Sequence, residues 1–296
     1  MTVKRRDHLD ALAIALLLGC CGLWGLNQVV VKATLPEVPP MLQAGLRSAI
    51  AALLVWVFAR SRGIALFSRD GSGPGGVAAG VLFGLEFCCV YSGLQYTTAS
   101  RLVVFLYLAP FVVAAGMRFV PHAERLTMPQ LAGLIGAFAS LAYAFQEGLA
   151  GGAPMQWLGD TLAVASGLLW GLTTVTVRAT RLAHASAERT LFYQLAVSAP
   201  ILFLAALANG ESLSAMPGGW AIGSVLFQSV VIAFASYLGW FWLLRHYPAT
   251  RLSAFTFLTP MFGLTFGALL LDEAISPRLL VAFCGIALGI WLVNRR

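Results

Sequence analysis

The stretch LWGLNQVVVKAT, Leu23–Thr34, returns further along the chain as LWGLTTVTVRAT, Leu169–Thr180. Eight of these twelve positions are identical. A second match follows in the same order, because Ala99–Pro110 shares six of twelve positions with Ala249–Pro260. Two collinear matches indicate an internal duplication. In a membrane chain, such a duplication is typical of a transporter.

The composition places the chain in lipid. Charged residues make up 10% of the 296 positions, against roughly 25% in soluble domains. Hydrophobic residues reach 59%, and the mean hydropathy is +0.83. One soluble core cannot bury that much apolar surface. The net charge of +7 comes from basic residues at segment ends rather than from a basic block, so nucleic acid is not the expected partner.

Ten apolar stretches divide the chain, and each has about the 17–23 residues that a helix needs to cross the hydrocarbon layer. We therefore predict an all-α polytopic membrane protein. The first stretch follows three basic residues like a signal peptide, but it carries the first copy of the repeat and is expected to be retained. The predicted spans are Leu9–Val31, Met41–Ala59, Gly76–Gln95, Ser100–Val120, Pro129–Gln146, Gln156–Val177, Thr190–Ala208, Trp220–Leu243, Arg251–Leu271 and Pro277–Val293.

The loop cations predict the orientation. With the N-terminus inside, fifteen basic residues face the cytoplasm and three face the opposite side. Because cytoplasmic loops are enriched in Lys and Arg, both termini are expected to be cytoplasmic. The predicted repeats, residues 1–150 and 151–296, each hold five spans. An odd number of spans inverts the second copy relative to the first, and inverted copies exchange conformations in many transporters.

Two ionisable side chains fall inside predicted spans. Glu86 lies near the centre of the third span and Arg47 about two turns from the outer end of the second. A buried charge costs about 2.5–3.5 kcal/mol on insertion scales and marks a functional candidate. One interpretation is a structural ion pair across the helices. In the other, Arg47 receives a substrate carboxylate, or Glu86 carries a proton. Tyr91 ranks lower, because five residues rotate it roughly 140° away from Glu86.

Polar and aromatic side chains complete the candidate site. Trp24 and Asn27 share one helix face at i, i+3 spacing, and Trp170 with Thr173 repeats the arrangement in the second copy. Packing or an interfacial belt is the alternative role for any single aromatic. The predicted substrate-contacting residues are Trp24, Asn27, Arg47, Glu86, Tyr107, Trp170, Thr173, Gln194 and Tyr237.

Proline and glycine suggest moving parts and close contacts. Pro110 and Pro260 occupy equivalent positions inside the fourth and ninth spans, where each removes a backbone hydrogen bond. They are predicted hinges, with static kinks as the alternative. Glycines spaced four apart serve either internal helix packing or a homodimer. These are Gly76, Gly80 and Gly84; Gly167 and Gly171; Gly263 and Gly267; and Gly285 and Gly289.

No motif predicts a cofactor, a metal or an enzymatic reaction. Neither lysine follows a GxxxxG loop, which argues against an ATP site of the P-loop type. The five cysteines lie in apolar runs without a CxxC spacing, so we interpret them as small apolar fillers.

These features together resemble the EamA family of the drug/metabolite transporter superfamily. The resemblance rests on the Trp-Gly pair in the first helix of each copy and on an Arg-Leu segment that leads to a proline. It also rests on acidic residues before each fifth helix, Glu124 and Asp272-Glu273. Within the family, the chain is similar to bacterial inner-membrane exporters of amino acids, particularly aromatic ones. The resemblance implies a central cavity lined by helices one to four and six to nine, peripheral helices five and ten, and alternating access without ATP.

The expected function is therefore a secondary transporter that exports amino acids, including aromatic ones, and similar small metabolites across the bacterial inner membrane. An amphoteric substrate suits Arg47 together with Glu86. A drug or organic-cation exporter is the alternative, and it predicts that only Glu86 is essential. A passive channel fits the paired prolines less well, and a membrane enzyme lacks a catalytic constellation.

Overall fold

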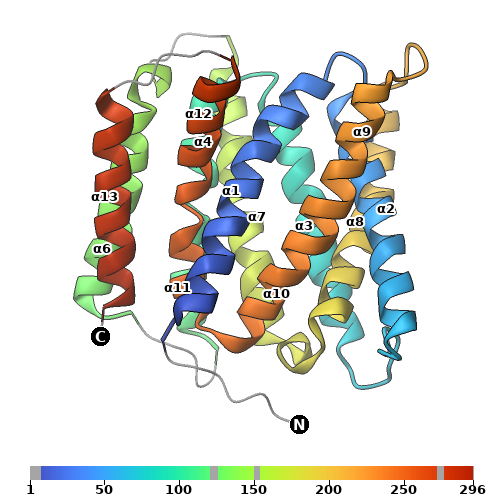
Figure 1. Ribbon diagram of the computed structural model, residues 1–296, viewed down its shortest axis with the longest axis horizontal. Helices are drawn as coiled ribbons and strands as arrows, with labels where there is room; N and C mark the ends of the chain where they lie inside the picture. Colours follow the sequence, from blue (N-terminus) through green and yellow to red (C-terminus); the bar gives the residue numbers. More distant parts are fainter. Residues whose placement is uncertain (1–7, 121–125, 150–153, 272–276, 296) are drawn as a thin grey trace.

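The computed structural model describes residues 8–120, 126–149, 154–271 and 277–295, and every regular element in these ranges is a helix. Glu124 and Asp272-Glu273 lie outside the described residues. The long helices run side by side between the two ends of the molecule (Figure 1). In chain order the α-helices are α1 (Ala11–Thr34), α2 (Pro40–Ser61), α3 (Gly73–Gly93), α4 (Ala99–Leu106), α5 (Ala109–Met117), α6 (Met128–Ala144), α7 (Gln156–Ala179), α8 (Ala187–Ala208), α9 (Gly219–Phe227), α10 (Tyr237–His246), α11 (Ala249–Phe255), α12 (Leu258–Leu271) and α13 (Pro277–Asn294). Two short 3-10 turns, η1 (Gln146–Leu149) and η2 (Arg181–His184), and a π-helical segment, η3 (Gln228–Ser236), complete the set.

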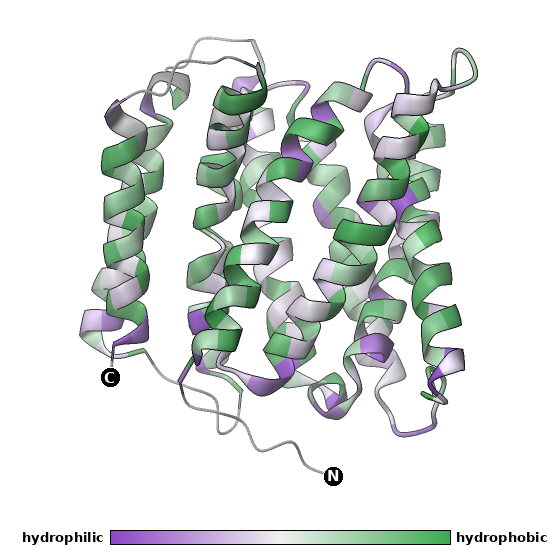
Figure 2. Ribbon diagram, viewed as in Figure 1, coloured by the Kyte–Doolittle hydropathy of each residue, from purple (hydrophilic) through white to green (hydrophobic). Residues whose placement is uncertain are grey.

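Seven helical runs in the described residues are long and apolar enough to cross a membrane. Three further apolar helices are shorter and span Arg101–Met117, Met128–Ala144 and Leu280–Asn294. All ten apolar stretches predicted from the sequence therefore fall on helices, although three of them are below full spanning length. Hydrophobic residues cover the sides of the bundle, and hydrophilic ones gather towards its ends (Figure 2).

Local sequence signals mark the starts of several helices. Asp10 caps α1, because its Oδ1 accepts a hydrogen bond of 2.9 Å from the Ala13 amide. Proline stands in the first turn of α2, α3, α5 and α6, where its missing N–H leaves no hydrogen bond unmade. The Gln130 side chain accepts a hydrogen bond from the Thr127 amide at the start of α6.

The helices pack as neighbours from different parts of the chain. α7 packs against α3, α4 and α5, and α1 packs against α12 and the α9–η3–α10 run. α2 and α3 both lie against α8. α6 and α13 form a pair at one side of the bundle (Figure 1). α1 begins and α13 ends at the same end of the bundle.

The glycine stripes expected from the sequence serve contacts inside the fold. A Cβ on Gly80 would lie 2.5 Å from the Val197 side chain of α8. Gly76 and Gly84, one turn before and one turn after Gly80 on α3, also face α8. A Cβ on Gly289 of α13 would lie 2.6 Å from the Gly133 carbonyl of α6. Small residues therefore let these helix backbones approach closely.

Both predicted proline positions coincide with helix breaks. α4 ends at Leu106 and α5 starts at Ala109, with Pro110 in its first turn. α11 ends at Phe255 and α12 starts at Leu258, with Pro260 in its first turn. Each proline thus begins a new helix rather than bending a continuous one.

Candidate functional site

The charged side chains of Arg47 and Glu86 are buried and carry polar atoms that lack hydrogen-bond partners within the described ranges. Arg47 on α2 is 2% exposed and Glu86 on α3 is 7% exposed. Arg47 Nε and Nη2 and Glu86 Oε2 have no hydrogen-bond partner among the described residues. The Arg47 guanidinium lies over the Phe87 ring, 4.5 Å from its centroid, and the charges of Arg47 and Glu86 act on one another. The two side chains therefore share one region, but they do not form the hydrogen-bonded pair that one interpretation of the sequence favoured.

An aromatic cluster joins this charged region to the first helix. Trp24 Nε1 donates a hydrogen bond of 2.8 Å to Ser236 Oγ. The Trp24 ring meets Tyr237 edge to face at 5.9 Å and Trp240 at 5.5 Å between centroids. Tyr237 in turn meets Phe83 of α3 at 6.2 Å. Trp24 is therefore linked through Tyr237 and Phe83 to α3, the helix that carries Glu86.

Two further predicted residues each carry a buried acceptor oxygen without a hydrogen-bond partner in the described part of the chain. Asn27 Oδ1 on α1 and Gln194 Oε1 on α8 have no partner among the described residues. Buried polar atoms without partners are rare in proteins, so each one calls for an explanation such as a ligand. No hydrogen bond joins Asn27 or Gln194 to Arg47 or Glu86 within the described residues. Thr173 differs, because its hydroxyl donates to the Leu169 carbonyl of its own helix at 2.9 Å.

Tyr107 and Trp170 lie in a second region, at the helix breaks. Their rings meet edge to face at 5.4 Å. Tyr107 ends α4 and also packs on Phe257, the residue between α11 and α12, at 5.8 Å. Among the described residues, no hydrogen bond, ion pair or ring contact joins these two rings to Arg47 or Glu86.

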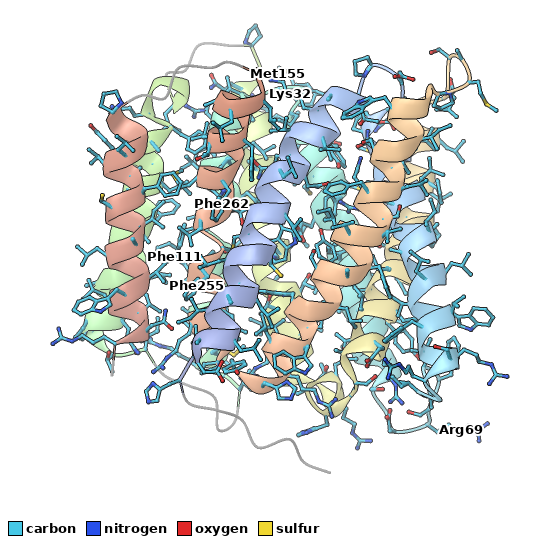
Figure 3. All side chains as sticks on the ribbon, viewed as in Figure 1. Lys32, Arg69, Phe111, Met155, Phe255 and Phe262 are labelled. Carbon is cyan, nitrogen blue, oxygen red and sulfur yellow. The ribbon has the colours of Figure 1, made fainter. Side chains whose placement is uncertain are left out.

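The glycine of each Trp-Gly pair lies where the first helix of its copy, α1 or α7, packs closely against the helix that follows a break, α12 or α5. A Cβ on Gly25 would lie 2.6 Å from Phe262 Cβ and 2.7 Å from the Gly263 amide nitrogen of α12. A Cβ on Gly171 would overlap Val112 of α5 and lie 2.9 Å from the Ala109 carbonyl. Because Phe262 and Val112 each follow the matched proline by two residues, the two contacts are equivalent in the repeat. Phe255 and Phe262 flank the break on the second copy (Figure 3).

A cysteine takes part in the same contact. Cys21 Sγ donates a hydrogen bond of 3.3 Å to the Phe255 carbonyl at the end of α11. In the second copy, Gly167 holds the equivalent position and faces the Phe105 carbonyl of the first copy, 2.7 Å from where its Cβ would stand. The interpretation of all five cysteines as apolar fillers was therefore incomplete. All five are free thiols.

Three features of the interior escaped the sequence analysis. Phe87 carries the cation–π contact with Arg47, and Tyr91 lies one turn further along, within electrostatic reach of the same guanidinium. Their i, i+4 spacing on α3 was a usable signal, but Tyr91 was compared only with Glu86. The π-helical segment η3, next to Tyr237, has no sequence signature. Such segments often occur at functional sites.

Ion pairs link neighbouring elements at both ends of the bundle. At the α7 N-terminus, Arg101 donates to both Asp160 carboxylate oxygens, at 3.0 and 2.6 Å, and to the Leu149 carbonyl. Asp160 also accepts from Thr97 at 2.8 Å, which joins α4 to α7. Met155, the residue before α7, lies at the end opposite Arg69 (Figure 3). Arg101 was counted only as a loop cation in the sequence analysis.

At the opposite end, Arg189 of α8 pairs with Asp70 and donates to the Ala65 carbonyl and to Ser72. Arg189 is 9% exposed and is therefore more than the solvated loop cation that the orientation argument assumed. Hydrogen bonds from Ser68 and Ser72, with Arg189 beside them, hold the pKa of Asp70 well below its usual range. The α2–α3 loop is thus tied firmly to α8.

Within the described ranges, no group of three or more His, Cys, Asp or Glu side chains is arranged to hold a metal ion. The arrangement instead combines buried polar groups, aromatic rings and paired helix breaks. Comparison with known proteins identifies the family. The sequence model of the EamA-like transporter family matches residues 11–146 and again residues 157–295. The chain belongs to the EamA-like transporter family.

Individual relatives are distant but cover nearly the full length. The chain is 27% identical over 277 residues to "Uncharacterized transporter YvbV" of Bacillus subtilis, covering 93% of this chain and 88% of that protein. It is 26% identical over 282 residues to "Probable amino-acid metabolite efflux pump" of Escherichia coli, covering 93% and 90%. A crystal structure of another protein has the same fold, with a TM-score of 0.80 at 20% identity over 94% of each chain. This EamA-family protein is therefore a polytopic membrane transporter.

Proposed function

We propose that this protein is a secondary transporter that exports amino acids, including aromatic ones, and similar small metabolites across the bacterial inner membrane. The single observation that carries the proposal is the set of unfilled hydrogen-bonding groups around Arg47 and Glu86. Arg47 offers two unpartnered nitrogens, Nε and Nη2, and Glu86 offers one unpartnered carboxylate oxygen. A zwitterion satisfies both, because its carboxylate accepts from the guanidinium and its ammonium donates to the carboxylate.

Aromatic side chains next to these charges favour an aromatic or large apolar substrate side chain. Phe87 lies directly beneath Arg47, Tyr237 lies within electrostatic reach of Glu86, and the Trp24 ring packs against Tyr237. Rings that meet edge to face contribute about 0.5–1.5 kcal/mol beyond the area they bury. Amino-acid export also agrees with the name of the Escherichia coli relative.

We further propose ten spans, arranged as inverted five-helix repeats over residues 1–150 and 151–296, with both termini in the cytoplasm. The two matches to the family model support the repeats. The equivalent contacts of Gly25 with α12 and of Gly171 with α5 support a two-fold relation between them. Inverted repeats supply two related conformations, so transport proceeds by alternating access without ATP, and the paired breaks at Pro110 and Pro260 act as hinges.

The test is a transport assay on the full chain in proteoliposomes with three related compounds. We expect exchange of labelled phenylalanine, and no exchange of phenethylamine or 3-phenylpropionate, each of which lacks one of the two charges. Arg47→Gln and Glu86→Gln should each lower phenylalanine flux by roughly 30-fold or more, since leaving one buried charge unpaired costs upward of about 2 kcal/mol. Arg62→Gln, at the exposed end of α2, is the matched control and should transport normally.

The second candidate function is export of organic cations, which is favoured by the buried, unpartnered carboxylate oxygen of Glu86. That function predicts transport of phenethylamine, which survives Arg47→Gln and is lost in Glu86→Gln. If no amino acid exchanges but another metabolite does, the substrate proposal is wrong and the transporter assignment stands. Flux that fails to saturate with substrate would instead indicate a channel.

A further inference from the structure

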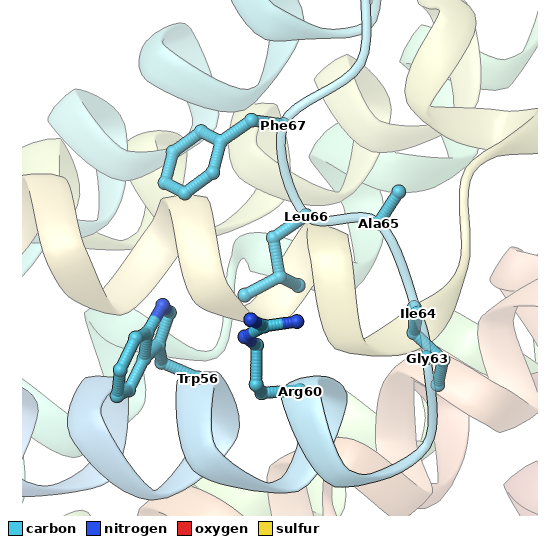
Figure 4. A pocket seen from close by; sticks show the side chains of 7 residues that line it. All are labelled: Trp56, Arg60, Gly63, Ile64, Ala65, Leu66 and Phe67. Carbon is cyan, nitrogen blue, oxygen red and sulfur yellow. The ribbon is translucent and has the colours of Figure 1, made fainter.

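A surface cavity lies where α2 ends, away from the Arg47 region. Its volume is about 340 Å³, and its lining comes from Trp56 and Arg60 of α2 and from residues 63–67 of the following loop (Figure 4). The loop that lines it leads to Arg69, which is labelled at this end of the bundle in Figure 3. The proposed transport function does not use it.

The loop wall of this cavity is held in place by groups on its other side. Gly63 ends α2 with a positive φ of 65°, and the Ile64 amide returns to the Ala59 carbonyl at 2.8 Å. Arg189 donates to the Ala65 carbonyl, and the Phe67 ring meets Phe192 of α8 at 5.4 Å. The loop therefore cannot fold over Arg60 without breaking these contacts, so the cavity is preformed.

Arg60 is the one cation on this lining, and it has no partner in the part of the chain that the structure describes. Its neighbours differ in this respect. Arg62 lies over the Phe58 ring at 5.4 Å, and Arg181 donates to the Asp70 carbonyl at 2.9 Å. The Arg60 guanidinium thus keeps its donors for an external acceptor, beside the exposed rings of Trp56 and Phe67.

An apolar stripe leads along α2 to this guanidinium. Leu53, Trp56 and Val57 are 59%, 44% and 51% exposed, and Arg60 follows on the same face at i+7 from Leu53. The stripe is apolar along the spanning part of α2 and cationic at its last turn. A molecule that fits has apolar chains along the stripe and an anionic headgroup at its end.

We propose that this cavity binds the phosphate of an anionic phospholipid, whose acyl chains lie along Leu53, Trp56 and Val57. Trp at the level of the headgroups and basic pockets at helix ends are features that hold lipids. A net negative headgroup is favoured over a zwitterionic one, because Arg60 has no acidic neighbour among the lining residues.

The test follows quenching of Trp56 by lipids brominated on their acyl chains, using the purified full-length protein at about physiological salt. The Trp56 signal is the difference between the wild type and Trp56→Phe. We expect phosphatidylglycerol to quench this signal at roughly five-fold lower concentration than phosphatidylcholine, from the attraction of one cation near the surface. Arg60→Gln should remove the preference, and Arg60→Lys should keep most of it.

Arg62→Gln is the matched control, because Arg62 lies at the same helix end without lining the cavity. The proposal is overturned if Arg62→Gln loses the preference as fully as Arg60→Gln, or if the two lipids quench equally. Displacement of phosphatidylglycerol by millimolar inorganic phosphate would assign the site to a free anion instead. A dimeric mass with no quenching would assign the stripe to a second copy.

Discussion

Tyr107 and Phe257 pack ring on ring, with centroids 5.8 Å apart and planes inclined by 34°, and they hold equivalent positions in the two copies of the repeat. Tyr107 ends α4, and Phe257 lies between α11 and α12. The two helix breaks therefore meet each other at their centres. The contact between the two breaks is thus made by two aromatic rings.

We predict that these two rings are energetically coupled. Phe257→Ala should destabilise the protein by about 3–5 kcal/mol, the usual range for removing a buried aromatic side chain. A double-mutant cycle with Tyr107→Ala should give a coupling of about 0.5–1.5 kcal/mol. Unfolding of the purified protein in detergent measures both values. The pair of Phe257 with the exposed Phe67 is the control and should be additive, and equal additivity in both cycles would contradict the coupling.

The two Trp-Gly glycines should be intolerant of a methyl group. Gly25→Ala places its Cβ 2.6 Å from Phe262, and Gly171→Ala places one against Val112, so helices must separate in each variant. Overpacking of this kind costs about 1–3 kcal/mol. Gly22→Ala, one turn earlier on α1, meets nothing within 4 Å and serves as the control. Thermal stability and transport should both fall for Gly25→Ala and Gly171→Ala only. Normal behaviour of Gly25→Ala would show that α1 and α12 do not approach as closely as described.

The Arg101–Asp160 ion pair should hold the start of α4 against α7. Asp160→Asn removes the ion pair, whose side chains are 16% and 20% exposed, and leaves the Thr97 contact. We expect amide hydrogen exchange at residues 99–102 to rise several-fold, since a partly exposed pair contributes up to about 1 kcal/mol. The exchanged pair, Arg101→Asp with Asp160→Arg, should recover part of the protection. Exchange at residues 249–252, at the other end, should not change. A uniform rise at both ends would indicate general destabilisation instead.

The lowered pKa of Asp70 predicts that the stability of the folded protein depends on pH. Its pKa in the folded protein lies below its ordinary value, because Ser68, Ser72 and Arg189 favour the carboxylate. A lowered pKa contributes stability that is present above the unfolded pKa of about 3.9 and is lost as the pH falls towards the folded pKa. The difference in melting temperature between the wild type and Asp70→Asn should therefore stay constant from neutral pH to about pH 5 and shrink below pH 4. A difference that grows on acidification would contradict this assignment.

Proton coupling is a separate prediction that concerns Glu86. If this carboxyl carries a proton, a pH gradient across proteoliposomes should change the initial rate of export, and Glu86→Gln should abolish that dependence. Asp70→Asn is a suitable control, because Asp70 lies in the α2–α3 loop outside the spanning helices. Equal initial rates with and without a gradient would show facilitated diffusion.

The helices could be predicted from the sequence, because their positions are marked by short stretches of it. The apolar stretches of spanning length fall on helices in the structure, and the prolines at repeated positions fall at helix starts. Burial of Arg47 and Glu86 was also predictable, since both lie inside apolar runs. The candidate site was predicted less completely. Phe87 was missed, and Tyr107 was placed with Arg47 although its contacts lie at the helix breaks.

By itself, the sequence determined that the chain is a duplicated, helical membrane protein with buried charges, because hydropathy and repeats follow from the order of the residues alone. The tertiary structure decided which of these residues meet. It paired Tyr107 with Phe257 across about 150 positions, set Gly25 against α12, and left Nε and Nη2 of Arg47 and Oε2 of Glu86 without hydrogen-bond partners among the residues that the structure describes. Such contacts depend on how helices from both copies pack, since side chains distant in the chain become neighbours only when the helix backbones approach.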